Sequence, residues 1–152
     1  MIKYIFSLTI IFSASLCAAQ IQGHVIRVLD GDTLEILQDK KPVRVRLANI
    51  DAPEKKQPFG RWSATQLKDL VAGKPVTVQY AQTDRYGRIL GRVYTADGTE
   101  ANRWQVRNGA AWVYPDYNND YTLPPLQRDA RALKRGLWAD KNPVPPWTWR
   151  TE

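Results

Sequence analysis

Apolar and polar residues alternate along several short stretches of the chain, and a period of two is typical of β-strands with one buried face. The clearest case is residues 43–47, where Val43, Val45 and Leu47 alternate with Arg44 and Arg46. Alternation of this kind, together with β-branched composition and flanking turn residues, predicts a set of strands. The predicted strands cover residues 21–29, 33–37, 43–47, 76–80 and 89–94.

Other stretches carry apolar residues at helical spacing and end before a glycine, which is favoured just after a helix C-terminus. They predict helices over residues 62–71, 100–108 and 126–135, followed by Gly73, Gly109 and Gly136. The last helix is expected to begin after Pro124-Pro125. Its buried stripe would consist of Leu126, Ala130, Leu133 and Leu137. The tail at residues 143–149, rich in proline and tryptophan, is predicted to be extended, with its indoles packed on the body.

The order of these elements predicts the fold class. Strands come first and outnumber the helices, connections are short, and one helix follows the third strand. This order is expected of a small Greek-key barrel that binds oligonucleotides. We therefore predict an α+β, mainly β domain: a five-stranded OB-fold barrel with three α-helices.

The first nineteen residues are typical of a signal peptide and are set apart from the fold. Lys3 precedes a mostly apolar run, and Cys17-Ala18-Ala19 offers small residues for cleavage before Gln20. The run is too short for a comfortable membrane span of about 20 residues; the alternative is an uncleaved anchor. The predicted domains are therefore a signal peptide at 1–19 and a barrel domain at 20–152, with its core at 21–140 and a tail at 141–152.

Composition narrows the possible chemistry. The 152 residues include 22 Lys and Arg, 15 Asp and Glu, one histidine and one cysteine, for a net charge of +7. One histidine excludes a paired-histidine metal site, and one cysteine excludes a disulfide framework. Cleavage would remove the cysteine, which suits an oxidising compartment. The excess of positive charge predicts a polyanionic partner.

Two segments with carboxylates could hold a hard cation. Asp30 and Asp32 flank Gly31 at a strand end, and closely spaced aspartates supply the oxygen ligands that calcium prefers. Asp51 and Glu54 follow the basic strand face with Pro53 between them. Taken one at a time, each residue is better explained as part of an ordinary turn or as a surface charge.

These residues together supply what a metal-assisted phosphodiesterase requires. Asp32 and Asp51 could be ligands, Glu54 a base, and Arg46 a two-point phosphate donor. Arg88 directly follows Gly87 in the loop at residues 83–88 and could reach a phosphate.

Aromatic residues could contact bases beside these charges. Tyr86 could stack beneath a nucleotide, and Arg85 lies beside it. Tyr114 and Tyr117, in the segment at 112–117, could also stack on bases. The alternative interpretations are a solvated hairpin tip for the first pair and core filling for the second.

Four segments in this order resemble the micrococcal nuclease (thermonuclease) family. The matching residues are 28–33, 46–54 and 83–88, then Asn102 with Val106-Arg107-Asn108-Gly109, and Gly136-Leu137-Trp138. The resemblance covers about residues 21–140, nearly the whole chain after the predicted signal peptide.

The resemblance implies a calcium-dependent endonuclease that acts on DNA and RNA and leaves 3′-phosphate ends. By position, the carboxylates of Asp32 and Asp51 and the carbonyl of Ala52 are similar to the calcium ligands. Glu54 is similar to the general base. Arg46 and Arg88 are similar to the residues that grip the phosphate. Asp30 and Thr33 are similar to the residues that support the calcium ligands.

Three departures from the family concern the surroundings of this centre. Ala52 stands where the best-known member has threonine, which removes a hydroxyl but keeps the carbonyl. The lysine-rich loop is shortened to residues 55–60. One of two expected nucleotide-contacting tyrosines aligns with Tyr117, while the other falls on Pro115, with Tyr114 as the candidate replacement.

The sequence thus predicts a secreted or periplasmic monomer that cleaves nucleic acid, with single strands preferred and no membrane contact after signal cleavage. One alternative is a non-catalytic OB-fold module that binds single strands through a basic groove and aromatic residues. Another is a surface protein that holds anionic lipid or polysaccharide, but this gives no reason for the Asp, Glu and Arg residues together.

Overall fold

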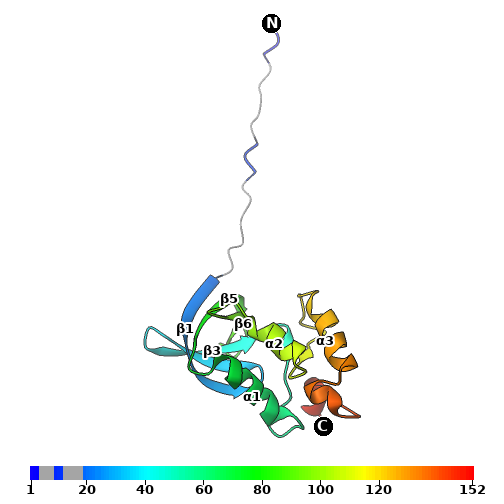
Figure 1. The fold of residues 1–152 in the computed structure, drawn as a ribbon. Coiled ribbons are helices and arrows are strands. Elements are labelled where there is room, and N and C mark those ends of the chain that lie inside the picture. Colours follow the sequence, from blue (N-terminus) through cyan, green and yellow to red (C-terminus); the bar gives the residue numbers. More distant parts are fainter. Residues whose placement is uncertain (4–8, 12–18) are drawn as a thin grey trace.

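The computed structural model describes residues 1–3, 9–11 and 19–152, and its centre is a β-barrel (Figure 1). The barrel strands are β1 (Ala19–Asp30), β2 (Thr33–Gln38), β3 (Lys41–Leu47), β5 (Pro75–Thr83) and β6 (Ile89–Thr95). They close in the order β1-β2-β3-β6-β5. All neighbours are antiparallel except β3 and β6, which are parallel. The five-stranded barrel predicted from the sequence is confirmed.

Alternation along the strands builds the core. Val45 and Leu47 of β3 are fully buried, whereas Arg44, which precedes Val45, is exposed. Leu34 and Val78, from β2 and β5, are buried in the same cluster. Because side chains alternate across a strand, the period that buries the valines turns the arginines of β3 outward, toward the face that carries the site.

The helices are α1 (Gly60–Val71), α2 (Ala101–Arg107), α3 (Leu123–Ala132) and α4 (Pro146–Trp149), with a 3₁₀ turn η1 at Gly136–Ala139. In Figure 1, α2 lies between the barrel and α3, and the C-terminal segment returns beneath α3. Contacts of α2 with α1, α3 and β6 agree with this arrangement. The first three helices match the three predicted ones.

Two details of the C-terminal half were predicted wrongly. Helix α3 begins at Leu123, so its prolines lie inside the first turn, where a missing N–H costs little. The helix ends at Ala132, which leaves Leu133 63% exposed and places Leu137 in η1 instead of on the same helical stripe.

The tail is not simply extended as the sequence suggested. Pro146–Trp149 forms the short helix α4, because prolines at its start are compatible with helical geometry. Trp147 packs against a second apolar cluster formed by Trp112, Ala130, Leu137 and Trp138.

A small two-stranded sheet outside the barrel was not predicted. It pairs β4 (Ile50–Asp51) with β7 (Trp112–Val113), in the register Ile50 to Val113 and Asp51 to Trp112. Strands of two residues show no period in a sequence, so the alternation pattern cannot reveal them. This sheet fixes the backbone of Asp51.

The predicted signal peptide lies for the most part outside the described residues. Ala19 is the first residue of β1 and pairs with Tyr80 of β5. Cleavage before Gln20 would therefore shorten the strand by one residue. Among the residues that the structure describes, no helix has the length and apolar character required to cross a bilayer.

Candidate active site

The two aspartates proposed as ligands come together at one end of the barrel. Asp32 follows the β1–β2 turn, and its side-chain Oδ2 accepts a hydrogen bond of 2.7 Å from the Ala52 N–H. The Leu47 N–H donates to the Asp32 carbonyl over 2.8 Å, which joins this turn to the end of β3. Asp51 precedes Ala52, so one backbone bond brings the two acidic segments, twenty residues apart, to the same place.

The turn that carries Asp32 is pressed onto α1. A Cβ at Gly31 would lie 1.8 Å from the Ser63 hydroxyl oxygen and 2.8 Å from the Ala52 Cβ. The buried Gln105 side chain also donates a 2.7 Å hydrogen bond to the Gly31 carbonyl. Only glycine fits this close approach, so the position of the aspartates is fixed by packing on a helix.

Arg46 is the counter-ion that Asp32 and Asp51 share. Its Nη2 lies 3.3 Å from a carboxylate oxygen of each. Its Nη1 donates to the carbonyls of Leu47 and Ile50 over 2.7 and 2.8 Å. The side chain is only 12% exposed, so these charges interact with little solvent between them. The Nη2 atom makes only the two longer contacts, so the guanidinium is held chiefly through Nη1.

The predicted supports, Asp30 and Thr33, both contact Asp32. The Thr33 hydroxyl donates to Asp32 Oδ1 over 2.9 Å, and Asp30 Oδ1 accepts a 3.0 Å hydrogen bond from the Asp32 N–H. Burial and the charge of Asp32 raise the pKa of Asp30 to about 8. Burial opposes ionisation of Asp32 as well, but Arg46 and the hydrogen bonds from Asp30, Ala52 and Thr33 outweigh it and lower the pKa of Asp32. At neutral pH, Asp32 is the charged member of this pair.

Glu54 lies at the rim of the same centre. Its side chain is 39% exposed, so its carboxylate reaches solvent, while Asp51 is 1% exposed. The Glu54 N–H donates to the side-chain oxygen of Gln57 over 3.1 Å, which holds the loop after Pro53. The exposure of Glu54 and the burial of Asp51 suit a base that meets water and a ligand that holds a cation.

Arg150 from the C-terminal tail binds both of these acids. Its Nη2 lies 2.7 Å from Asp51 Oδ2, and its Nη1 lies 2.8 Å from Glu54 Oε1 and 3.1 Å from Asp51 Oδ1. Burial raises the pKa of Asp51, and Arg150 opposes this rise. The sequence analysis assigned no role to this residue, because an arginine near the end of a proline-rich tail has no pattern that connects it with residues a hundred positions earlier.

The structure does not bring Arg88 to the carboxylates. Its Nε lies 2.7 Å from Asp84 Oδ2, and its guanidinium carbon lies 5.6 Å from the centre of the Tyr86 ring. The guanidinium of Arg85 lies 4.9 Å from the same ring, and Tyr86 is 69% exposed. These residues form the loop between β5 and β6. Among the described residues, the ion-pair partner of Arg88 is therefore Asp84, and Arg88 forms no ion pair with Asp32, Asp51 or Glu54.

The predicted tyrosine contacts lie in the segment that follows β7. The ring centroids of Tyr114 and Tyr117 are 4.7 Å apart, and Tyr117 is 71% exposed. The Tyr114 hydroxyl accepts a 3.4 Å hydrogen bond from Arg150, which places Tyr114 next to the acids. Trp147 stacks on Tyr114 with centroids 5.4 Å apart and an interplanar angle of 9°. Tyr114 therefore supplies an aromatic ring next to Pro115, the position where the family's second tyrosine is expected.

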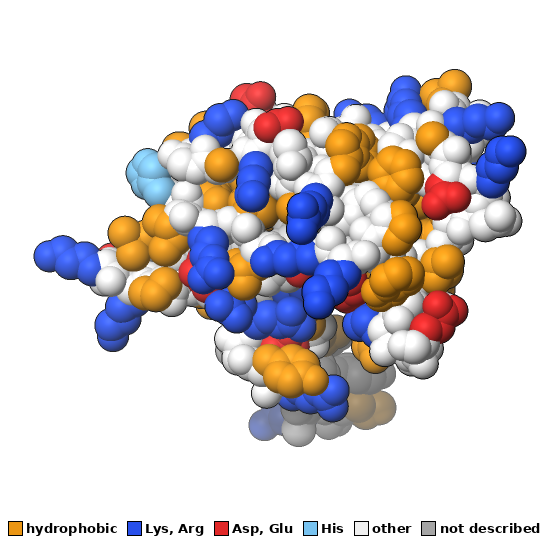
Figure 2. All heavy atoms as spheres, turned by 90° about the horizontal axis from the view of Figure 1, so that it is seen from below, with side chains coloured by type: hydrophobic (Ala, Val, Ile, Leu, Met, Phe, Trp, Pro, Cys, Tyr) orange, Lys and Arg blue, Asp and Glu red, His pale blue; other side chains and the backbone are white. Residues whose placement is uncertain are grey.

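One face of the molecule carries many positive charges. In Figure 2, Lys and Arg side chains gather across the middle of one face, with acidic side chains among them. Lys55 and Lys56, which directly follow Glu54, are both exposed. A face of this kind attracts an extended polyanion.

The donor set suits a hard divalent cation only if backbone or water oxygens complete it. In the part of the chain that the structure describes, no group of three or more His, Cys, Asp or Glu residues converges as a metal site. Asp32 and Asp51 lie close together as a pair, and the buried Asp51 carboxylate forms an ion pair with Arg150. The residues present therefore fit a cation held by two carboxylates, with the Ala52 carbonyl as a further oxygen donor.

Several known proteins are similar to this chain. Residues 44–140 match the family model described as "Staphylococcal nuclease homologue". An Escherichia coli protein described as "Uncharacterized endonuclease" is 61% identical over 148 residues, which cover 97% of each chain. A Shigella flexneri protein named "Micrococcal nuclease" is 40% identical over 142 residues, covering 87% of this chain and 82% of its own. "Protein ParB" of Escherichia coli is 39% identical, covering 100% of this chain and 92% of its own.

Proposed function

Because the chain belongs to the staphylococcal nuclease family and is therefore a nuclease, we propose that it is an exported, calcium-dependent endonuclease of DNA and RNA. It hydrolyses phosphodiester bonds with little sequence specificity, breaks the bond to the 5′ oxygen and leaves 3′-phosphate ends. The observation that carries the proposal is the grouping of Asp32, Asp51, Glu54 and Arg46 at one end of the barrel.

Each side chain has a role that follows from its surroundings. The exposed carboxylate of Glu54 accepts the proton of the attacking water. The Nε–Nη2 edge of Arg46 binds two phosphate oxygens and stabilises the charge that develops on them. Arg88 adds a second guanidinium from the β5–β6 loop. We assign it charge stabilisation alone, because a guanidinium hardly loses a proton.

Calcium held by Asp32, Asp51 and the Ala52 carbonyl would supply further positive charge beside the scissile phosphate. The protein's own contribution is to keep this site small and fixed. Asp30 and Thr33 orient Asp32 through hydrogen bonds, and the β4–β7 pair fixes Asp51.

We propose that the substrate runs between two aromatic edges. Arg85 and Tyr86 lie on the β5–β6 loop, and Tyr114, which contacts Tyr117, lies next to Arg150 at the acids. Exposed aromatic rings bind unstacked bases without regard to sequence, so single strands are the preferred substrate. The protein acts as a monomer.

One experiment tests the proposal against a non-catalytic binding module. The purified, exported protein is incubated with single-stranded DNA and RNA, with calcium or with a chelator, and the product ends are identified. We expect cleavage in calcium only, with 3′-phosphate ends. Binding without cleavage in calcium would support the binding module, and equal cleavage in chelator would refute calcium dependence.

Export rests on residues 1–19, and we propose that the mature chain begins at Gln20 in the periplasm or outside the cell, free of the membrane. Removal of Lys3 and Cys17 leaves a chain without a thiol. Intact-mass spectrometry of the protein recovered from the periplasm or medium measures the N-terminus directly. A mass that includes Met1 would contradict cleavage.

A further inference from the structure

The C-terminal tail places a positive charge where the proposed cation would bind. Arg150 makes two hydrogen bonds to Asp51, one to each carboxylate oxygen, at 3.1 and 2.7 Å. Its third bond, of 2.8 Å, reaches Glu54 Oε1. One guanidinium therefore engages both the proposed ligand and the proposed base. The interaction with Asp51 raises the pKa of Arg150 above its ordinary value, so Arg150 is a permanent cation.

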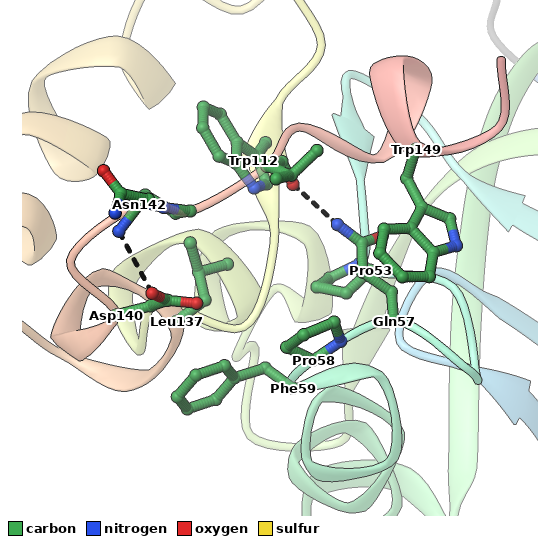
Figure 3. Close-up of a pocket in the computed structure, with 11 residues that line it drawn as sticks. Pro53, Gln57, Pro58, Phe59, Trp112, Leu137, Asp140, Asn142 and Trp149 are labelled. Carbon is green, nitrogen blue, oxygen red and sulfur yellow. Dashed lines mark hydrogen bonds between the residues drawn. The ribbon is translucent and has the colours of Figure 1, made fainter. Parts of the chain in front are cut away.

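This guanidinium is delivered by a packed segment. The Gln57 side chain donates a 2.6 Å hydrogen bond to the Val144 carbonyl, while its oxygen accepts from the Glu54 N–H (Figure 3). Trp147 stacks on Tyr114 and meets Trp112 edge to face, with centroids 5.5 Å apart. Gln57 thus connects the tail directly to the loop of the catalytic base.

The backbone of the tail also folds toward the site. The N–H groups of Thr148, Trp149 and Arg150 donate to the carbonyls of Pro145 and Pro146 over 3.0 Å. In Figure 3, Trp149 lies beside Pro53 and Gln57, against the segment that connects Asp51 with Glu54. The short helix therefore sets Arg150 over the acids.

Arg150 and a divalent cation need the same oxygen atoms. Calcium binds carboxylate oxygens at about 2.3–2.6 Å. Both oxygens of Asp51 are already engaged by Arg150, and one of them also lies 3.3 Å from Arg46. A third positive group at this buried carboxylate would meet strong repulsion from the guanidinium. The two cations cannot both make their full contacts with Asp51.

We propose that Arg150 is a built-in counter-cation that closes the metal-free site, and that a divalent cation must displace it from Asp51 and Glu54. The inference rests on the proposed function, because it takes Asp51 as a ligand. Displacement frees Glu54 to accept a proton at the same moment that the cation enters, so loading of the site and activation of the base are one event.

Calcium affinity measured by isothermal titration calorimetry, without nucleic acid, tests the competition. If Arg150 occupies the site in about nine-tenths of the molecules, its removal tightens the apparent calcium affinity about tenfold. Arg150→Gln should show this gain, and Arg150→Lys a smaller one, because lysine lacks the two-point fork. Arg128→Gln is the matched control, since Arg128 is an exposed arginine on α3, and it should bind calcium as the unchanged protein does.

A second measurement follows the tail itself. Hydrogen exchange of residues 145–152 should speed up when calcium is added to the unchanged protein, because the displaced tail loses its contacts. Circular dichroism establishes that each variant is folded. Arg150→Met, which keeps the apolar stem of the side chain, replaces the glutamine variant if the latter does not fold.

The outcomes separate this inference from the proposed function. Equal calcium affinity in Arg150→Gln and the unchanged protein, with calcium-dependent cleavage intact, would overturn the inference alone. Absence of calcium binding in every variant would overturn both. Unchanged exchange of the tail on calcium binding would also refute displacement.

Discussion

Arg46 shows how one side chain can serve both structure and chemistry. It neutralises two buried carboxylates and donates to two carbonyls at the end of β3. Lysine carries the same charge but lacks the planar fork that makes several directed contacts at once. The function of this position therefore depends on the geometry of the guanidinium as well as on its charge.

Arg46→Lys is expected to lower kcat/KM for single-stranded DNA by at least about 10²-fold, as is typical when a directed donor to the transition state is lost. Steady-state cleavage rates in calcium measure the effect. Arg44→Lys is the matched control two residues earlier on the same strand, where Arg44 pairs with Glu35 and its side chain is 47% exposed. A near-normal rate for Arg46→Lys would mean that Arg46 is peripheral to the reaction.

Glu54→Gln tests the proposed role of Glu54 as the general base and leaves the other residues of the site unchanged. The amide keeps the size of the side chain but cannot accept the proton of water, so the rate should fall by at least about 10²-fold. Calcium binding, measured by calorimetry, should persist, because Asp32 and Asp51 remain. Glu35→Gln, which removes a carboxylate from an ion pair at the barrel surface, should leave the rate unchanged. An unaltered rate in Glu54→Gln would exclude Glu54 as the base.

The residues of the centre divide into those that the sequence could reveal and those that it could not. Asp32, Asp51 and Glu54 stand in short segments with turn residues between them, and this local signal singled them out. The contacts of Gln57 and Arg150 join positions 87 and 96 residues apart. Such contacts follow from how the tail packs, so they have no local pattern from which they could be predicted.

The β5–β6 loop depends on a single aspartate. Asp84 Oδ1 accepts the N–H groups of Tyr86 and Arg88, each over 2.9 Å, while Oδ2 binds the Arg88 side chain. Burial opposes ionisation of Asp84, but the hydrogen bonds from Arg88 and Tyr86 together outweigh it and lower the pKa of this carboxyl. A lowered folded-state pKa means that this interaction is present above the ordinary value near 3.8 and is lost only as the pH falls below it.

Asp84→Ala should therefore release Arg88 and Tyr86 at neutral pH and lower the cleavage rate by about tenfold, a typical effect of losing the orientation of a catalytic group. The thermal midpoint should change little, because the loop is exposed. Asp97→Ala is the control, since Asp97 accepts hydrogen bonds from Thr95 and Thr99 in a turn outside the site. Equal rates in the two variants would show that the position of Arg88 does not limit the reaction.

Periodicity was sufficient for the barrel but insufficient for the elements at its edge. The valines and leucines of β3 and β5 repeat every second residue, so burial of one face fixed their strand character. The β4–β7 pair is too short to show a period, and α4 follows prolines that indicated an extended tail. Both elements lie beside Asp51, so the sequence singled out the candidate site residues but missed part of the structure that holds them.

The charge of the whole chain determines how the substrate is attracted. The sequence carries +7, and Lys and Arg side chains gather on the face shown in Figure 2. Each phosphate contact to a single strand releases counterions, and the logarithm of affinity falls with the logarithm of salt by about 0.7 per contact. Steep salt dependence is therefore the expected signature of a partner bound through its backbone, whatever its base sequence.

The last prediction concerns Arg85, whose guanidinium lies over Tyr86 at the entrance to the loop. If Arg85 contacts a phosphate, Arg85→Gln should weaken binding equally for all sequences. It should also reduce the slope of log affinity against log salt by the contribution of about one phosphate contact. Fluorescence anisotropy in chelator, where cleavage does not occur, measures affinity over a range of salt. Arg128→Gln carries the same loss of charge on α3 and should keep the full slope. If both variants lose the same slope, only the net charge matters; if binding is independent of salt, the ligand is not held by its phosphates.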